Sequence, residues 1–116
     1  MRLSENFYRS EFKCKCGQCD YDTVDAELVE VLQMLRDKFK ASIKVTSGNR
    51  CPEYNKHVGG AVSSYHIRGR AADIQVAGVT PYEVQKHLKL MYMDMYGIGS
   101  YETFTHIDTR TKAGRW

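Results

Sequence analysis

Three residues with metal-binding side chains dominate the chemistry of this 116-residue chain. His66 and Asp73 lie on either side of Gly69, with Asp73 inside a predicted strand. This spacing allows an imidazole and a carboxylate to meet at one point, and His106 could join them from a neighbouring strand. Two histidines and one carboxylate, with a fourth position left open, are a typical donor set of a catalytic zinc site.

The same residues belong to a longer pattern, formed by SYHIRGRAAD (64–73) and THID (105–108). This pattern resembles the signature of the zinc D-alanyl-D-alanine carboxypeptidase superfamily, which includes peptidoglycan peptidases, phage endolysins and proteins of the hedgehog-type fold. The run SGNR (47–50) and the turn Gly59-Gly60 match as well. The resemblance therefore covers nearly the whole chain, from residue 5 to residue 116.

The resemblance implies that His66, Asp73 and His106 bind one catalytic Zn²⁺. A water molecule would occupy the open position, with its pKa lowered towards ~7. Arg50 stands where the family anchors its substrate, and Ser64 is a second candidate for substrate binding. A guanidinium can pair with a carboxylate through two parallel hydrogen bonds, or polarise the scissile carbonyl.

One position departs from the family pattern. Many members carry a glutamate or aspartate three residues before the last zinc histidine, as general base and acid, whereas this chain has Thr103. The nearest carboxylates are Glu102 and Asp108, and Asp108 shares the strand face of His106. We predict that Asp108 is the general base, with Glu102 as the alternative. In two further interpretations, Asp108 only orients a zinc ligand, or the zinc-bound hydroxide acts unaided.

The resemblance implies a zinc metallopeptidase of the carboxypeptidase or endopeptidase type. It would hydrolyse an amide bond of the peptidoglycan stem peptide, next to D-alanine. A small single domain suits a phage or prophage endolysin, or a virion-associated lysin. The alternative is a non-catalytic zinc-binding module on the same fold, which the missing carboxylate at Thr103 keeps open.

Four cysteines form a second group. Cys14, Cys16 and Cys19 lie close together around a glycine, and Cys51 follows much later. Short spacings of this kind are typical of thiolate zinc sites, whereas disulfides are uncommon in proteins that are not secreted. Three interpretations stay open: a second, structural zinc at Cys14, Cys16 and Cys19, completed by Cys51 or a histidine; reduced thiols; or a disulfide.

The elements that must position these residues are predicted from hydrophobic periodicity and turn signals. The first 22 residues form an irregular arm that contains the three clustered cysteines. Helices are predicted over 23–40, 52–57 and 80–93, and strands over 42–47, 71–76 and 103–109. We expect one α+β domain over residues 1–116, with a small antiparallel sheet, two main helices packed on it and the zinc site at the sheet cleft.

Charge and hydropathy argue against a nucleic-acid-binding domain, a membrane-spanning protein and a protein with a signal peptide. The net charge of +3 comes from 17 basic and 14 acidic residues. They are scattered without the basic stripe of a nucleic-acid-binding domain. The apolar stretches are too short to cross a membrane, and the first residues lack the apolar segment of a signal peptide. We expect a monomer in the cytoplasm of the producing cell that reaches the peptidoglycan on lysis or as part of a virion.

Overall fold

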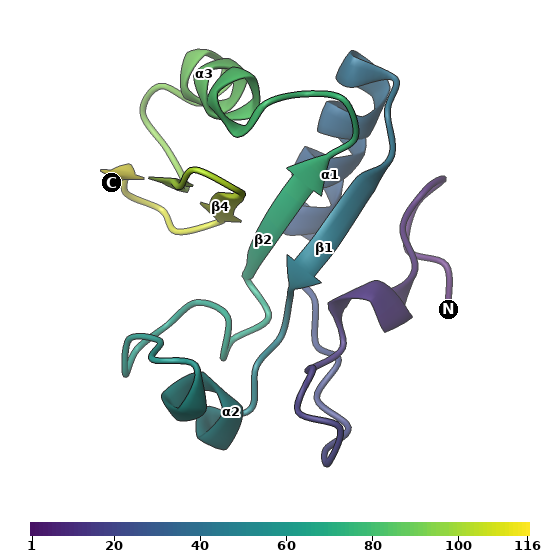
Figure 1. Ribbon diagram of the computed structural model, residues 1–116, viewed down its shortest axis with the longest axis vertical. Helices are drawn as coiled ribbons and strands as arrows, with labels where there is room; N and C mark the ends of the chain where they lie inside the picture. Colours follow the sequence, from purple (N-terminus) through teal and green to yellow (C-terminus); the bar gives the residue numbers. More distant parts are fainter.

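The computed structural model describes residues 1–116, in which a five-stranded sheet is packed against helices (Figure 1). The strands are β1 (Ile43–Ser47), β2 (Ala71–Val76), β3 (Gly97–Ser100), β4 (Thr105–Asp108) and β5 (Gly114–Arg115). Their order across the sheet is β1-β2-β4-β3-β5, and only the β3–β5 pair is parallel. The predicted α+β class, with a mostly antiparallel sheet, is confirmed.

The helices are α1 (Ala26–Phe39), α2 (Pro52–His57) and α3 (Pro81–Met91), with a 3-10 turn η1 (Arg9–Phe12) in the arm. Figure 1 shows α1 behind β1 and β2, and α3 at the end of the molecule opposite α2. Leu28, Leu32 and Leu35 share one face of α1 and are fully buried against the strand residues of a single core. Burying each leucine stabilises the fold by about 1.5–3 kcal/mol. None of the helices combines the length and apolarity needed to cross a membrane.

Some helix and strand boundaries in the structure differ by a few residues from those predicted from the sequence. The first helix begins at Ala26 rather than at residue 23, after Asp25. The Asp25 carboxylate does not cap that helix but accepts a hydrogen bond from the Thr109 hydroxyl, at 3.0 Å. Thr80 caps α3, since its hydroxyl oxygen accepts a hydrogen bond from the amide of Glu83 at 3.2 Å.

Two strands, β3 and β5, are absent from the sequence prediction. The two glycines of β3 weaken the strand signal, because glycine has low intrinsic strand propensity. The structure gives a reason for Gly97: a Cβ at this position would collide with the carboxylate of Asp108 on the neighbouring strand. Gly99 similarly leaves space for the indole of Trp116. Both glycines therefore leave space for side chains that come from other parts of the chain.

The turn at Gly69 brings the two halves of the SYHIRGRAAD run together. Gly69 has a φ of +70°, a left-handed conformation that favours glycine, and its amide donates to the His66 carbonyl at 3.3 Å. The chain then reverses into β2, where Asp73 lies directly opposite His106 in the antiparallel register with β4. His66, Asp73 and His106 are therefore brought together by one turn and one strand pair.

Replacing Gly69 by alanine should destabilise the protein more than the same change at Gly78. Both glycines have positive φ, but a Cβ at residue 69 would lie 2.5 Å from the Thr23 carbonyl oxygen, whereas none lies within 4 Å at Gly78. We expect Gly78→Ala to cost about 1 kcal/mol from backbone strain alone, and Gly69→Ala roughly 3 kcal/mol because of the added clash. Urea unfolding measures both, and equal losses would contradict the packing at Gly69.

Candidate metal centre

Three side chains with metal-binding atoms meet at the middle of the sheet. Asp73 Oδ1 lies 3.3 Å from His66 Nε2 and 3.0 Å from His106 Nδ1. One ligand atom from each residue lies within 4.8 Å of the others, and all three residues are buried. The structure thus brings together the three residues that the sequence analysis selected, with one nitrogen of each histidine directed at the same carboxylate oxygen.

The ring of His66 is oriented by the loop that precedes α2. Its Nδ1 lies 2.8 Å from the carbonyl oxygen of Gly48, which can only accept a hydrogen bond, so Nδ1 carries the proton. Nε2 is therefore the ring nitrogen that faces Asp73. The same loop also holds the His66 backbone, because its carbonyl accepts from the Asn49 side chain and the Arg50 amide, each at 2.9 Å.

The ring of His106 lies between two carboxylates. Its Nε2 is 2.8 Å from Asp108 Oδ2, on the side of the ring away from Asp73. A histidine that binds a metal through one nitrogen commonly donates its other N–H to a carboxylate, which fixes the ring and makes it a stronger ligand. Asp108 is completely buried and is itself held by Arg110, at 2.7 and 2.8 Å, and by the Gly97 amide at 3.1 Å.

The two carboxylates of the site are held in the ionised form. Burial alone would raise the pKa of Asp73, but hydrogen bonds to His106 and His66 and their charges outweigh it and hold its pKa well below the usual range. His106 and Arg110 outweigh burial at Asp108 in the same way and also lower its pKa. Both carboxylates are therefore ionised at neutral pH. The ionised carboxylate of Asp73 and the two imidazoles, each with an outer partner, fit Zn²⁺ in donor type.

Arg50 holds the second oxygen of Asp73. Its Nη2 lies 3.2 Å from Asp73 Oδ2, while Nε donates to the Ser47 hydroxyl at 3.0 Å and Nη1 to the Asn55 side-chain oxygen at 3.1 Å. This contact leaves Oδ1 of Asp73 facing the two histidines. Arg50, predicted as the substrate anchor, therefore also orients a candidate metal ligand.

The three donors lie at one side of a cleft of about 510 Å³. Ser64 and Arg50, for which we predict a role in substrate binding, both line this cleft. The Ser64 hydroxyl oxygen accepts a hydrogen bond from the His66 amide at 3.2 Å. Sequence reasoning did not select its aromatic lining, which comprises Tyr65, Tyr101, Phe104 and Trp116. Tyrosine is frequent in this chain, with 8 residues, so its occurrence alone carried no signal.

The two carboxylates predicted for proton transfer lie outside this cleft. Asp108 contacts His106 through the nitrogen that faces away from Asp73 and lines no part of the cleft. Glu102 is exposed in the turn between β3 and β4 and also does not line the cleft. Among the interpretations considered from the sequence, this geometry favours Asp108 as the residue that orients His106. The identity of the general base stays a prediction.

Comparison with known protein families identifies a match. A family model described as Peptidase M15 matches residues 5–108. No curated protein matches the chain. The matched range includes His66, Asp73, His106 and Asp108, together with all four cysteines.

Replacing Asp108 by asparagine should weaken zinc binding by about 10–100-fold, because the side chain that fixes and polarises the His106 ring loses its charge. Competition with a chromophoric chelator measures the affinity. Glu102→Gln removes an exposed carboxylate of the neighbouring turn and serves as the matched control, with unchanged affinity. Unchanged zinc affinity in Asp108→Asn, combined with a roughly 10²-fold loss of turnover, would instead support Asp108 as the general base.

Proposed function

The chain belongs to the peptidase M15 family, and we propose that it hydrolyses an amide bond of the peptidoglycan stem peptide next to D-alanine. The family is one of zinc metallopeptidases of the peptidoglycan-peptidase type. The observation that carries the proposal is the meeting of His66, Asp73 and His106 beside a cleft large enough for a short peptide.

In this proposal His66, through Nε2, the Asp73 carboxylate and His106, through Nδ1, hold one Zn²⁺. When bound, the ion polarises the scissile carbonyl and activates a water molecule for attack. The protein keeps the donors in place beforehand: Gly48 and Asp108 fix the two rings, and Arg50 fixes the carboxylate. Ligands held in this way need little rearrangement, which is how a protein supports a metal site.

Arg50 and Ser64 are the proposed substrate-binding residues. A guanidinium has five N–H donors, and the contacts of Arg50 to Ser47, Asn55 and Asp73 use three of them. The remaining donors are available for the carboxylate or the scissile carbonyl of a stem peptide. The Ser64 hydroxyl oxygen accepts from the His66 amide, so its own proton can be donated to the substrate.

Positive charge and flat aromatic surfaces suit the rest of this substrate. Arg110 also lines the cleft and lies over the Trp116 ring, with its guanidinium carbon 4.9 Å from the ring centroid. Tyr101 and Phe104 stack at 4.4 Å, and Trp116 Nε1 donates to the Tyr101 hydroxyl at 3.0 Å. These contacts link the aromatic side chains of the cleft, so that an extended peptide would meet ring faces and the unused N–H donors of the two arginines.

Asp108 contributes to the reaction by orienting and polarising the His106 ring, because a ring that binds Zn²⁺ through Nδ1 and donates from Nε2 cannot relay a proton. The general base at Asp108 or Glu102 stays a prediction from the sequence. Because Glu102 is exposed and outside the cleft, Glu102→Gln should lower kcat less than ~10-fold at saturating zinc. A collapse of kcat in Glu102→Gln, with normal turnover in Asp108→Asn, would assign the general base to Glu102.

The proposed setting is a monomeric phage or prophage endolysin, or a virion-associated lysin, that acts on the cell wall after lysis or during entry. This setting rests on the resemblance of residues 64–73 and 105–108 to the family signature, which phage endolysins share. The competing proposal is a zinc-binding module without activity, which is supported by Thr103 at the position where relatives carry a carboxylate.

Digestion of purified peptidoglycan separates the two proposals. We expect the zinc-loaded protein to release muropeptide fragments, a chelator to stop the release and added Zn²⁺ to restore it. Mass spectrometry of the fragments identifies the bond by the new termini or by free D-alanine. Intact cell walls after incubation with folded, zinc-loaded protein would contradict the peptidase and favour the binding module.

Arg50→Lys should lower kcat/KM by about 10–100-fold, because a lysine cannot contact Ser47, Asn55 and Asp73 together and still present donors to the substrate. Arg36→Lys, on α1 and outside the cleft, is the matched control and should retain normal activity. Equal kcat/KM values for the two variants would remove Arg50 from the proposed site.

A further inference from the structure

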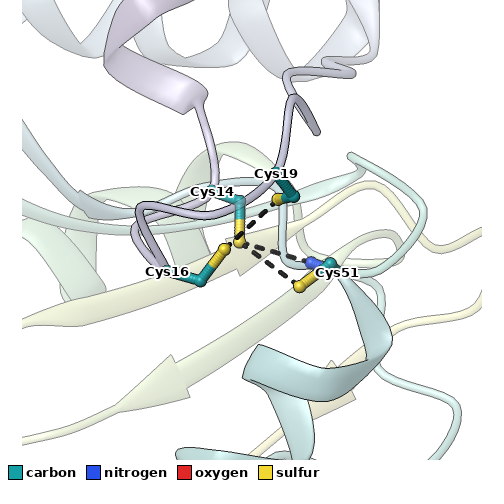
Figure 2. Close-up of side chains that lie close together, drawn as sticks. All are labelled: Cys14, Cys16, Cys19 and Cys51. Atoms are coloured by element: carbon teal, nitrogen blue, oxygen red, sulfur yellow. Dashed lines mark hydrogen bonds between the residues drawn. The ribbon is translucent and has the colours of Figure 1, made fainter.

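The four cysteines form one compact cluster at the join between the arm and α2. Cys14, Cys16 and Cys19 come from the arm, and Cys51 immediately precedes α2. Figure 2 shows the four side chains pointing their sulfur atoms at a common centre. All four Sγ atoms lie within 4.8 Å of one another, although 37 residues separate Cys14 from Cys51.

The sulfur separations are close to those of a tetrahedral thiolate site. Zinc–sulfur bonds of ~2.3 Å place neighbouring sulfurs of a regular tetrahedron ~3.8 Å apart. The Sγ atoms of Cys14 and Cys51 are 3.8 Å apart, and those of Cys16 and Cys19 are 3.3 Å apart. Two separate disulfides would require only that the two sulfurs of each pair lie close together. One metal ion requires all four sulfurs to lie close to one another, as they do here.

Backbone amides are directed at three of these sulfurs. The Cys51 amide donates to Cys14 Sγ at 3.4 Å, the Gln18 amide to Cys16 Sγ at 3.3 Å, and the Tyr54 amide to Cys51 Sγ at 3.4 Å. A thiol needs no such donors, but hydrogen bonds from N–H groups stabilise the charged thiolate that binds a metal. This is a second observation, independent of the sulfur positions, that points to a cation.

We propose that Cys14, Cys16, Cys19 and Cys51 bind one Zn²⁺ as a closed structural site, separate from the His66, Asp73 and His106 centre. Four thiolates saturate the tetrahedral coordination of zinc and leave no position for water, so this site supports folding rather than hydrolysis. A zinc ion with four thiolates carries a net charge of about −2.

The site fastens the arm to the loop that orients the metal centre. Cys51 directly follows Arg50, which holds Asp73, and that loop also contains Gly48, which holds the ring of His66. Asn49 also links this loop to the arm and to the residue that follows the arm: its amide donates to the Phe12 carbonyl at 2.8 Å, and its side-chain oxygen accepts from the Thr23 amide at 2.9 Å. A metal at the four cysteines would add a much stronger link at the adjacent position. The proposal does not depend on which reaction the cleft carries out.

Metal analysis of variants tests the proposal. We expect about two zinc ions per chain in the full-length protein purified under reducing conditions, and one in both Cys19→Ser and His106→Ala. His57→Ala is the matched control, because this exposed histidine lines the hollow beside the cysteines without belonging to the cluster. It should retain both ions. Loss of an ion in His57→Ala, or an unchanged count in Cys19→Ser, would overturn the assignment.

Cobalt substitution gives a readout that does not rely on the folding of a cysteine variant. Co²⁺ bound by thiolates produces an intense sulfur-to-metal charge-transfer band, which we expect in the unmodified protein and in His106→Ala at equal strength. A protein without this band, with no thiols reactive after denaturation, would contain disulfides and contradict the site. Iron in place of zinc in the purified protein would overturn the identity of the metal.

Discussion

The antiparallel pairing of β2 with β4 is the constraint on which the candidate active site depends. In this register Asp73 lies directly opposite His106, and their side chains share one face of the sheet. A slip of one residue would turn one of the two side chains to the opposite face and separate the donors. His66 then needs only the tight turn at Gly69 to reach the same point. The core packing of α1 and α3 stabilises this register by burying the other face of the strands.

Each of the three donors is fixed by a different outer partner, which explains why so small a domain can hold buried charge. A backbone carbonyl orients His66, a carboxylate orients His106 and a guanidinium orients Asp73. Arg110 in turn neutralises the buried Asp108. No buried side-chain nitrogen or oxygen lacks a hydrogen-bond partner, so the burial of these polar groups is compensated throughout.

The sequence predicted those parts of the molecule that depend on local pattern. The bounds of α2 and β2 agree with the prediction residue for residue, because proline at the first helical turn and a run of β-branched and small apolar residues are strong local signals. The sequence prediction missed β3 because its two glycines, Gly97 and Gly99, leave space for Asp108 and Trp116, and these contacts exist only in the folded chain. The hydrogen bond between the His66 ring and the Gly48 carbonyl could not be predicted, because every residue type has a backbone carbonyl. Cys51 likewise joins Cys14 only through the tertiary fold.

A crystal structure of the zinc-loaded protein, with anomalous data at the zinc absorption edge, tests the central claim most directly. The account predicts an anomalous peak coordinated by Nε2 of His66, the carboxylate of Asp73 and Nδ1 of His106, with Asp108 still bonded to Nε2 of His106. The absence of a peak between these three residues, or coordination through Nε2 of His106, would contradict it.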